Sequence, residues 1–480
     1  MVDAWRDLFV RSDLEGLRAL EDATSVALRS LNPSTRARSA VAATELRAIA
    51  QRLPIFPDEG LDVSEVLKEQ SEKVFSHSVW PHHVATVAHL HPPVTVASAA
   101  SEVLIAAANQ SMDSFDQAPL ATHIELALLD TVARLLGLPS GATGIMTSGG
   151  TASNLLGLTL ARAVAGRHLG HDVGRDGLPD EARRWRFLCS DQAHFSVERA
   201  AAQLGLGRQS VVRVMTDDHR RLDLRALDHA LDEVSRVGDV PVAIVGTAGT
   251  TDLGAIDPLA GIAERAHRVG AWFHVDAAVA GAFAVSPVLR SRLAGLGDAD
   301  SVTVDFHKLW WQPFNASALL VRDESTFDIL RVASSYLDRG DELDGMVNLV
   351  GRSLDTSRRF DAAKVVASLR VLGRRQFSAM LEHLCDLASF AYQVLDEHPL
   401  FAPIVSPEGV TVVFDAPGYD SDTLRRVQQD LLQRGDMILG RTVIGDRPAL
   451  KFTFMNPLTT SDDVRHLVDA VALEVARFPA

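Results

Sequence analysis

The chain has 480 residues, 47% of them hydrophobic and 23% charged, which is enough to bury a large core in two or three domains. Its 62 acidic residues outnumber its 47 lysines and arginines. The formal net charge of −15 therefore disfavours a polyanionic partner, and no nucleic-acid function is expected.

Cysteine usage and hydropathy indicate where the protein works. Cys189 and Cys385 are too few for a disulfide framework or a four-ligand zinc site, so we expect no metal centre and a reducing compartment. The N-terminus has no basic region followed by an apolar core, and no stretch approaches about 18 uninterrupted apolar residues. These features predict a cytoplasmic protein without a membrane partner.

The first part of the chain has helical periodicity. Residues 1–75 contain amphipathic patterns broken at 31–33 and 53–54, without the alternation typical of strands. We therefore expect an N-terminal helical segment over residues 1–80.

The middle of the chain has the rhythm of an α/β domain. Helical stretches such as 222–237 and 259–269 alternate with short β-rich runs at 185–190, 210–215, 242–246, 272–275 and 301–304. This alternation predicts a mostly parallel sheet covered by helices, in a large domain over residues 81–355.

The last part of the chain predicts a smaller α/β domain over residues 356–480. A long helical stretch follows Phe360. After it, helices at 422–433 and 461–478 alternate with strand-like runs at 410–414, 438–443 and 450–454.

A glycine pair precedes an apolar helical run that begins at Leu155. In the segment 148–154, Gly150 and Thr151 would bring backbone N–H groups and a hydroxyl to a helix N-terminus, where a phosphate is favoured. A tight turn without a ligand is the alternative interpretation of this short motif.

Three further polar groups follow predicted strands. Asp276 ends one apolar strand, Lys308 follows the next, and His194 follows the strand at 185–190. Taken singly, each has an ordinary interpretation: a capping or solvated aspartate, a surface lysine, a structural histidine. Together they stand at strand ends, where a doubly wound sheet gathers its ligand-binding groups.

With these motifs, the chain resembles the group II pyridoxal 5′-phosphate (PLP) dependent amino-acid decarboxylases of fold type I, from about residue 82 to 457. The resemblance implies that Lys308 forms the Schiff base with PLP, Asp276 holds the pyridinium nitrogen protonated, and His194 stacks on the ring. It implies decarboxylation of an L-amino acid through a quinonoid intermediate.

The resemblance also implies further cofactor contacts. Gly150, Thr151 and His307 match the family's phosphate contacts, while Thr247 and Ala278 match positions that line the other edge of the cofactor.

Two segments, 109–119 and 348–362, look like the branch that decarboxylates L-2,4-diaminobutyrate and lysine. In family dimers the first segment reaches the neighbouring active site, so a homodimer with shared sites is implied. Asp113 or Asp116 is then the candidate partner for the distal ammonium of a diamino acid, although either aspartate could instead cap a helix.

Two positions depart from the family pattern. Lys451 stands where many relatives carry an arginine for the substrate carboxylate, which keeps the charge but loses the bidentate geometry. Leu349 stands where many relatives carry a proton-donating tyrosine, and none of the three tyrosines, Tyr336, Tyr392 and Tyr419, takes that position.

Two alternatives remain open at this point. One is decarboxylation in which O₂ intercepts the intermediate, so that the products are an aldehyde and ammonia. The other is a catalytically silent homologue that binds a partner without PLP, against which the presence of Lys308, Asp276 and His194 argues.

Overall fold

The computed structural model describes residues 8–32, 35–331, 345–445 and 447–479. The chain forms two compact units. The first unit comprises Met1–His89, Val394–Ala402 and Phe414–Ala480, and the second comprises Leu90–Gln393 and Pro403–Val413.

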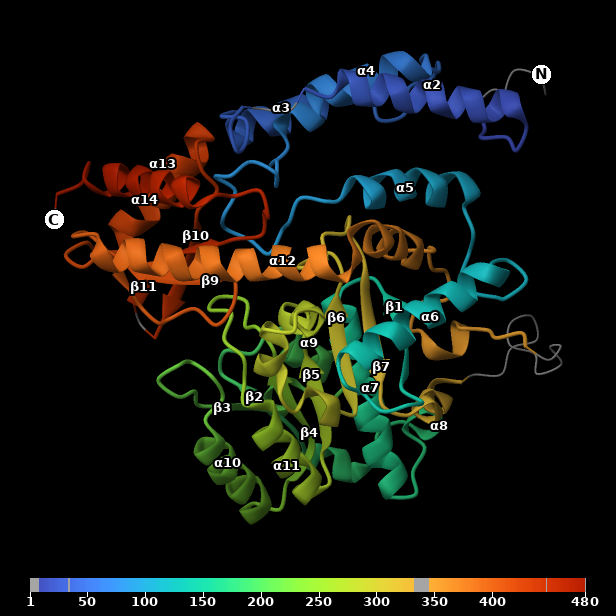
Figure 1. The fold of residues 1–480 in the computed structure, drawn as a ribbon. Helices are drawn as coiled ribbons and strands as arrows, with labels where there is room; N and C mark the ends of the chain where they lie inside the picture. The colour runs from blue at the N-terminus through green and yellow to red at the C-terminus, as the bar shows by residue number, and fades with distance from the viewer. Residues whose placement is uncertain (1–7, 33–34, 332–344, 446, 480) are drawn as a thin grey trace. The chain divides into compact units, whose positions relative to one another are not determined.

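The second unit is built on a seven-stranded sheet with the order β1-β7-β6-β5-β4-β2-β3 (Figure 1). Neighbouring strands from β6 to β3 pair in parallel, and β7 runs antiparallel to both β1 and β6. The expected mostly parallel α/β architecture is confirmed. The strand bounds are β1 Thr143–Thr147, β2 Trp185–Ser190, β3 Val211–Val214, β4 Val240–Thr247, β5 Trp272–Asp276, β6 Ser301–Asp305 and β7 Ser317–Val321.

The helices that pack against this sheet are α6 Pro119–Leu135, α7 Gly150–His168, α9 Ser196–Gln203, α10 Leu224–Arg236 and α11 Leu259–Val269. The chain also forms α5 Val96–Ala108, α8 Val173–Asp176 and α12 Ala362–Glu397. Short 3₁₀ helices lie at Asp180–Arg184, Arg208–Ser210, Ala280–Val285, Leu289–Leu293, Leu296–Asp298, Glu324–Leu330 and Val350–Arg352.

Helix α7 is the central helix of the second unit. It contacts β1, β4, β5, β6 and β7, and it is buried around most of its circumference. Its N-cap, Gly149, has a φ of 147°, a conformation that glycine adopts easily and that other residues avoid. Because α7 crosses the sheet, polar residues of its first turns, including Ser153 and Asn154, lie in the protein interior.

The described residues near the N-terminus, 8–32 and 35–89, form the helices α2 Leu14–Ser30, α3 Ala43–Arg52 and α4 Val63–Lys73 in the first unit. Asp13 and Asp62 cap α2 and α4 with side-chain hydrogen bonds, and α2 and α3 end at the breaks expected from the sequence. The predicted N-terminal helical segment is confirmed.

The C-terminal part of the chain forms a four-stranded sheet with the order β10-β11-β9-β8. Its strands are β8 Ala402–Pro403, β9 Thr411–Asp415, β10 Gly440–Ile444 and β11 Arg447–Thr453, and β10 pairs antiparallel with β11. Helices α13 Ser421–Arg434 and α14 Ser461–Val475 accompany it. The predicted C-terminal α/β layer is therefore present, while the three-part division of the chain by residue number stays a prediction.

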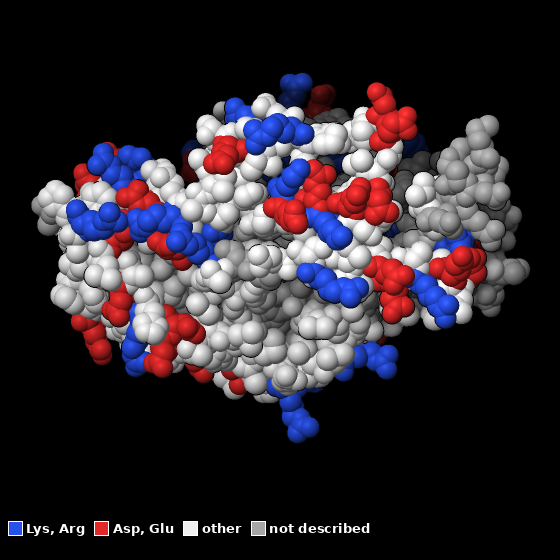
Figure 2. All heavy atoms as spheres, turned by 90° about the horizontal axis from the view of Figure 1, so that it is seen from above, with Lys and Arg blue, Asp and Glu red and all other residues white. Residues whose placement is uncertain are grey.

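Charges of both signs are mixed on the surface. On the face drawn in Figure 2, Lys and Arg side chains are interspersed with Asp and Glu. Within the described ranges, the helices are all too short or too polar to cross a bilayer.

Candidate active site

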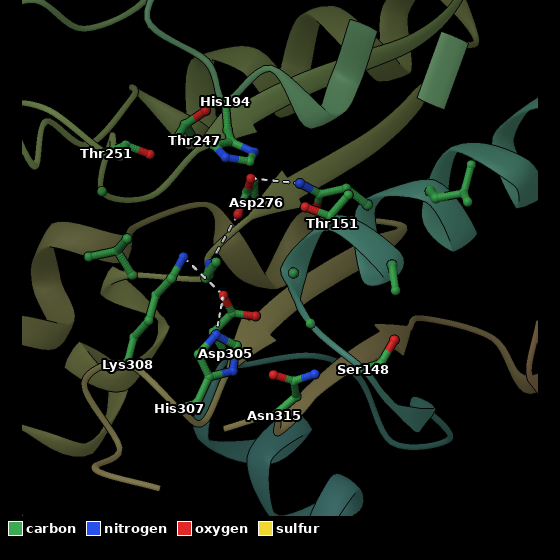
Figure 3. Close-up of a pocket in the computed structure, with 18 of the residues that line it drawn as sticks. Ser148, Thr151, His194, Thr247, Thr251, Asp276, Asp305, His307, Lys308 and Asn315 are labelled. Carbon is green, nitrogen blue, oxygen red and sulfur yellow. Dashed lines mark hydrogen bonds and ion pairs between the residues drawn. The ribbon is translucent and has the colours of Figure 1, made fainter. Parts of the chain in front are cut away.

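A cavity of about 560 Å³ opens at the carboxyl ends of β4, β5 and β6 (Figure 3). The start of α7 and the turns after these strands enclose it. The eight predicted cofactor-binding residues all line it: Gly150, Thr151, His194, Thr247, Asp276, Ala278, His307 and Lys308. Strand ends of a parallel sheet share one edge, so residues separated by more than 150 positions meet here.

Lys308 lies in the turn after β6 and points toward a buried carboxylate. Its Nζ is 2.9 Å from Oδ2 of Asp305, and only about a fifth of the lysine side chain is exposed. Ser317 on β7 donates a hydrogen bond of 2.5 Å to the other carboxylate oxygen. Lys308 is therefore held within the cavity, and the surface-lysine interpretation is wrong.

Asp276 is the last residue of β5 and is almost fully buried. Asn154 on α7 donates to its Oδ2 at 2.8 Å, and the backbone N–H of Ala278 donates to its Oδ1 at 3.1 Å. Each oxygen keeps acceptor capacity that faces the cavity, so this carboxylate is able to bind a cationic N–H group.

His194 lies beside Asp276 in the cavity (Figure 3). Its Nδ1 is 2.9 Å from the hydroxyl of Ser196 and 3.3 Å from the backbone N of the same residue. Burial lowers the pKa of the imidazole below its ordinary value, although the nearby Asp276 carboxylate opposes this shift. His194 is therefore neutral at neutral pH.

The glycine pair, Gly149 and Gly150, lines the cavity. A Cβ added to Gly150 would lie 2.9 Å from both carboxylate oxygens of Asp305, so a larger residue would fill this space. The first N–H groups of α7 have no partner within the helix and carry the positive end of its dipole. His307 also lines the cavity, with its Nδ1 2.9 Å from the carbonyl of Ala316 and its Nε2 3.6 Å from Oδ2 of Asp305.

Thr247 supplies a polar atom that the protein itself does not satisfy. Its Oγ1 is buried and has no hydrogen-bond partner among the described residues. Nearby, a Cβ at Gly249 would lie 2.9 Å from Cβ of Val279, so the glycine allows the backbone to lie close to Val279. An unpaired hydroxyl, a glycine cradle and a buried carboxylate fit a flat, polar, phosphorylated ring.

The predicted substrate contacts do not lie in this cavity. Asp113 and Asp116 are not among its lining residues: Asp113 accepts from Gln117 at 2.8 Å, and Asp116 accepts from Ser114 at 2.5 Å. Neither aspartate caps α6, because the N-cap is Ala118, without a side-chain hydrogen bond. Lys451 lies on β11 beside Gly440 of β10, and all three substrate contacts stay predictions.

Leu349 is a core residue. It is buried in a cluster with Met112, Ile145 and Phe327, away from the lining residues of the cavity. No tyrosine of the described residues lines the cavity, and Tyr336 lies outside them.

Sequence reasoning missed several polar residues of this region. Asp305 was not among the predicted site residues, yet its carboxylate pairs with the Lys308 amine and lies beside Gly150. Asn154 and Ser196 join Asp276 to His194, and Asn315 lines the cavity. An asparagine inside an otherwise apolar helix was the available signal for Asn154.

A second, smaller cavity of about 230 Å³ shares Ser148 and Asn315 with the first. Arg358 lines it, and its Nη1 pairs with the fully buried carboxylate of Glu125 at 2.9 Å. This ion pair ties the segment after residue 355 to α6 and β1, since the guanidinium also contacts the carbonyl of Met146.

Fold and cavity together define the class of protein: an α/β enzyme that binds a small ligand at the carboxyl edge of its sheet. The family model described as the pyridoxal-dependent decarboxylase conserved domain matches residues 46–416.

Individual relatives match over nearly the whole chain. An L-2,4-diaminobutyrate decarboxylase of Acinetobacter baumannii is 35% identical over 98% of this chain and 96% of that protein. One of Rhizobium meliloti is 36% identical over 98% of this chain and 94% of that protein. A crystal structure from Vibrio parahaemolyticus is 32% identical, with a TM-score of 0.91 over 99% of this chain and 100% of that chain. It is described as the glutamate decarboxylase domain of diaminobutyrate-pyruvate transaminase and L-2,4-diaminobutyrate decarboxylase.

The chain therefore belongs to the pyridoxal-dependent decarboxylase family, and its reaction is PLP-dependent amino-acid decarboxylation.

Proposed function

We propose that the protein decarboxylates L-2,4-diaminobutyrate with PLP bound in the 560 Å³ cavity. The choice of substrate is carried by one observation: two L-2,4-diaminobutyrate decarboxylases are 35% and 36% identical to this chain over 98% of its length. The cavity supports the choice of cofactor, because a buried carboxylate, an amine and an unpaired hydroxyl line it together.

Three sets of residues would hold PLP. Lys308 would bind its aldehyde through an imine, and Asp276 would bind its ring nitrogen. Gly150, Thr151 and His307 would bind its phosphate, while Thr247, Ala278 and His194 would flank the ring.

When bound, PLP supplies an electron sink for the electron pair left by departing CO₂. Asp276, whose carboxylate is anchored by two donors, would accept a hydrogen bond from the protonated ring nitrogen and so keep the ring positively charged. Asp305 holds the Lys308 ammonium whenever that amine is free. We assign to His194, whose ring is oriented by Ser196, the delivery of a proton to the substrate carbon. Because burial lowers the pKa of its imidazole, the ring must first take up the proton that it delivers.

A diamino acid adds a distal ammonium that needs an anionic partner. We assign this role to Asp113 or Asp116 of the neighbouring subunit in a homodimer, and the substrate carboxylate to Lys451. L-2-Aminobutyrate has the same carbon chain without the distal amine and is the matched control substrate. Replacing the correct aspartate by asparagine should raise KM for diaminobutyrate about tenfold, and leave KM for aminobutyrate within twofold.

Mixed dimers test the shared site. Subunits with Lys308→Ala should be inactive with diaminobutyrate, and subunits with the aspartate variant should have the raised KM. A mixed dimer regains one intact site only if the aspartate acts across the interface. Sedimentation at equilibrium gives the stoichiometry, and a monomeric protein with full activity would contradict the proposed assembly.

The competing reaction consumes oxygen. Leu349 lies in the core and no described tyrosine lines the cavity, which favours a slower protonation step. Turnover of diaminobutyrate in air and under argon separates the two outcomes. We expect equal amounts of CO₂ and 1,3-diaminopropane, with the same rate in both atmospheres.

Stoichiometric O₂ consumption with ammonia release would overturn simple decarboxylation. Undetectable turnover of diaminobutyrate beside good turnover of an aromatic or neutral amino acid would overturn the substrate. A purified protein without visible absorbance, even after addition of PLP, would instead support the silent homologue.

A further inference from the structure

A line of buried polar side chains crosses the second unit beneath α7. Trp272, His274 and Asp276 alternate along β5, so they share one face of the sheet. Ser301 and Thr303 of β6 pair with His274 and Asp276 in register and lie beside them on that face. Asn154 of α7 packs against this line, and its amide group hydrogen-bonds with His274, Asp276 and Thr303.

The chemistry of Asp276 fixes how Asn154 is oriented. An ionised carboxylate only accepts hydrogen bonds, so the atom 2.8 Å from Asp276 Oδ2 is the donor Nδ2 of Asn154. Oδ1 of the amide therefore faces Thr303 and His274, at 2.7 and 3.0 Å. Both of these groups must donate to it.

The same logic fixes the tautomer of His274. Its Nε2 carries the proton that Asn154 Oδ1 accepts, so Nδ1 accepts from the hydroxyl of Ser301 at 2.8 Å. The indole Nε1 of Trp272 donates to the Ser301 oxygen at 2.8 Å. Every hydrogen bond from Trp272 to Asp276 consequently points the same way, toward the carboxylate.

Burial keeps the His274 imidazole neutral, as this pattern of hydrogen bonds requires. Asn154, His274, Ser301 and Thr303 are at most 1% exposed, and burial lowers the pKa of His274 to about 4. A Cβ at Gly157 would lie 2.8 Å from the His274 ring, so this glycine allows the close approach of α7. A neutral imidazole with one proton is what the direction of the hydrogen bonds requires.

Asn154 is also linked to His194 through the hydroxyl of Ser196. Its Nδ2 also donates to the Ser196 oxygen at 2.8 Å, so the Ser196 hydroxyl is free to donate to Nδ1 of His194 at 2.9 Å. The backbone N–H of Ser196 points at the same Nδ1. His194 then carries its proton on Nε2.

We propose that Asn154 is a positioning residue for the reaction: one amide orients the Asp276 carboxylate and, through Ser196, holds His194 as the Nε2–H tautomer. This inference rests on the proposed roles of Asp276 and His194. The observation that carries it is that Nδ2 of one side chain donates hydrogen bonds to both Ser196 and Asp276, each at 2.8 Å. A change at Asn154, which is buried beneath the cavity, should therefore alter both groups at once.

The test compares four variants of the full-length chain. Asn154→Leu keeps the shape of the side chain and removes its hydrogen bonds to Asp276 and Ser196. Ser196→Ala removes only the link to His194, and Thr303→Val removes one donor to the amide oxygen of Asn154. Thr159→Val is the matched control, because Thr159 is a buried residue of the same helix and its hydroxyl, among the residues described, bonds only to the Leu155 carbonyl.

Two readouts precede any turnover. Titration of cofactor-free protein with PLP should give an affinity at least tenfold weaker for Asn154→Leu, a few-fold weaker for Thr303→Val, and within twofold of wild type for Ser196→Ala and Thr159→Val. Imidazole ¹⁵N spectra, with His194 assigned by His194→Gln, should show an unprotonated Nδ1 in wild type and Thr159→Val. In Asn154→Leu and Ser196→Ala they should show a larger share of the Nδ1–H form.

Unchanged PLP affinity together with unchanged His194 shifts in Asn154→Leu would overturn the proposal. If that variant does not fold by circular dichroism, Thr303→Val and Ser196→Ala decide in the same way, and wild-type values in both would overturn it. Failure of the wild-type protein to decarboxylate diaminobutyrate would instead count against the proposed function, since neither readout depends on turnover.

Discussion

The two edges of the seven-stranded sheet differ sharply. At the carboxyl edge, the 560 Å³ cavity gathers Asp276, Asp305, His194 and Lys308. At the amino edge, a cavity of about 270 Å³ is lined mainly by apolar residues: Ala161, Val164, Ala165, Leu169, Trp185, Val240, Pro241, Val242 and Trp272.

The strands between the edges are almost entirely buried, so the difference does not come from the sheet interior. It comes from what lies at the strand ends. Helix α7 begins at the carboxyl edge with free N–H groups and ends at the amino edge with Arg167 and His168 in its last turn. The sheet thus concentrates polar chemistry at one edge and packing at the other.

The largest effect should follow removal of the amine at the carboxyl edge. Lys308→Ala should abolish turnover and the borohydride-stable attachment of PLP, because Lys308 is the one lysine among the described residues that line the cavity. Mass spectrometry after reduction checks the attachment. Normal activity and a PLP adduct in this variant would refute the assignment of Lys308.

The next largest effect should come from the charge on Asp276. Asp276→Asn should bind PLP but lose about a hundredfold or more in kcat, because a neutral amide does not hold the ring nitrogen protonated. Steady-state kinetics at saturating PLP measures this effect. A kcat close to that of wild type would remove the electron-sink argument.

The buried line between the two edges should make stability depend on pH. The pKa of His274 is lowered to about 4 from its ordinary 6.5, so below pH 6.5 the unfolded chain takes up a proton that the folded protein refuses. The free energy of unfolding should therefore fall between pH 6.5 and 4, by about 3 kcal/mol from this residue.

Urea unfolding of His274→Gln and of the exposed control His267→Gln isolates this contribution. The stability of His274→Gln should depend less on pH than that of wild type, and His267→Gln should behave like wild type. Equal slopes in all three proteins would show that His274 does not bury its neutral form.

A smaller effect should come from Asp305, the carboxylate beside the lysine. Asp305→Asn keeps the hydrogen bond from Ser317 possible but removes the charge that pairs with Lys308 at 2.9 Å. We expect kcat/KM to fall about tenfold. Ser317→Ala is the control, and a larger loss in that variant than in Asp305→Asn would assign the effect to packing.

The smallest effect on turnover should come from the amino edge. Trp185→Phe should lower the free energy of unfolding by about 1–2 kcal/mol because it leaves a small cavity, while kcat should stay within twofold of wild type. Chemical unfolding and kinetics on the same preparation test this. A loss of activity without a loss of stability would contradict the division between the edges.

The sequence predicted the parallel strands of the sheet with small errors at their ends, since buried strands between turn signals are distinct in composition. It did not identify β1 and β7. Strand β1 comes first in the chain, yet in the sheet it pairs with β7, the last of the seven strands, and β7 runs antiparallel to both of its neighbours. Antiparallel insertion of a short strand depends on tertiary pairing, which local periodicity does not report.

What the sequence by itself determined was the set of residues at strand ends. Lys308, Asp276 and His194 follow recognisable strands, and parallel strands bring their carboxyl ends to one edge. The tertiary structure alone decided which groups hold them in place. Asn154, Ser196 and Asp305 act through contacts with residues 2 to 149 positions away, and a buried polar side chain reveals its role only when its partner is known.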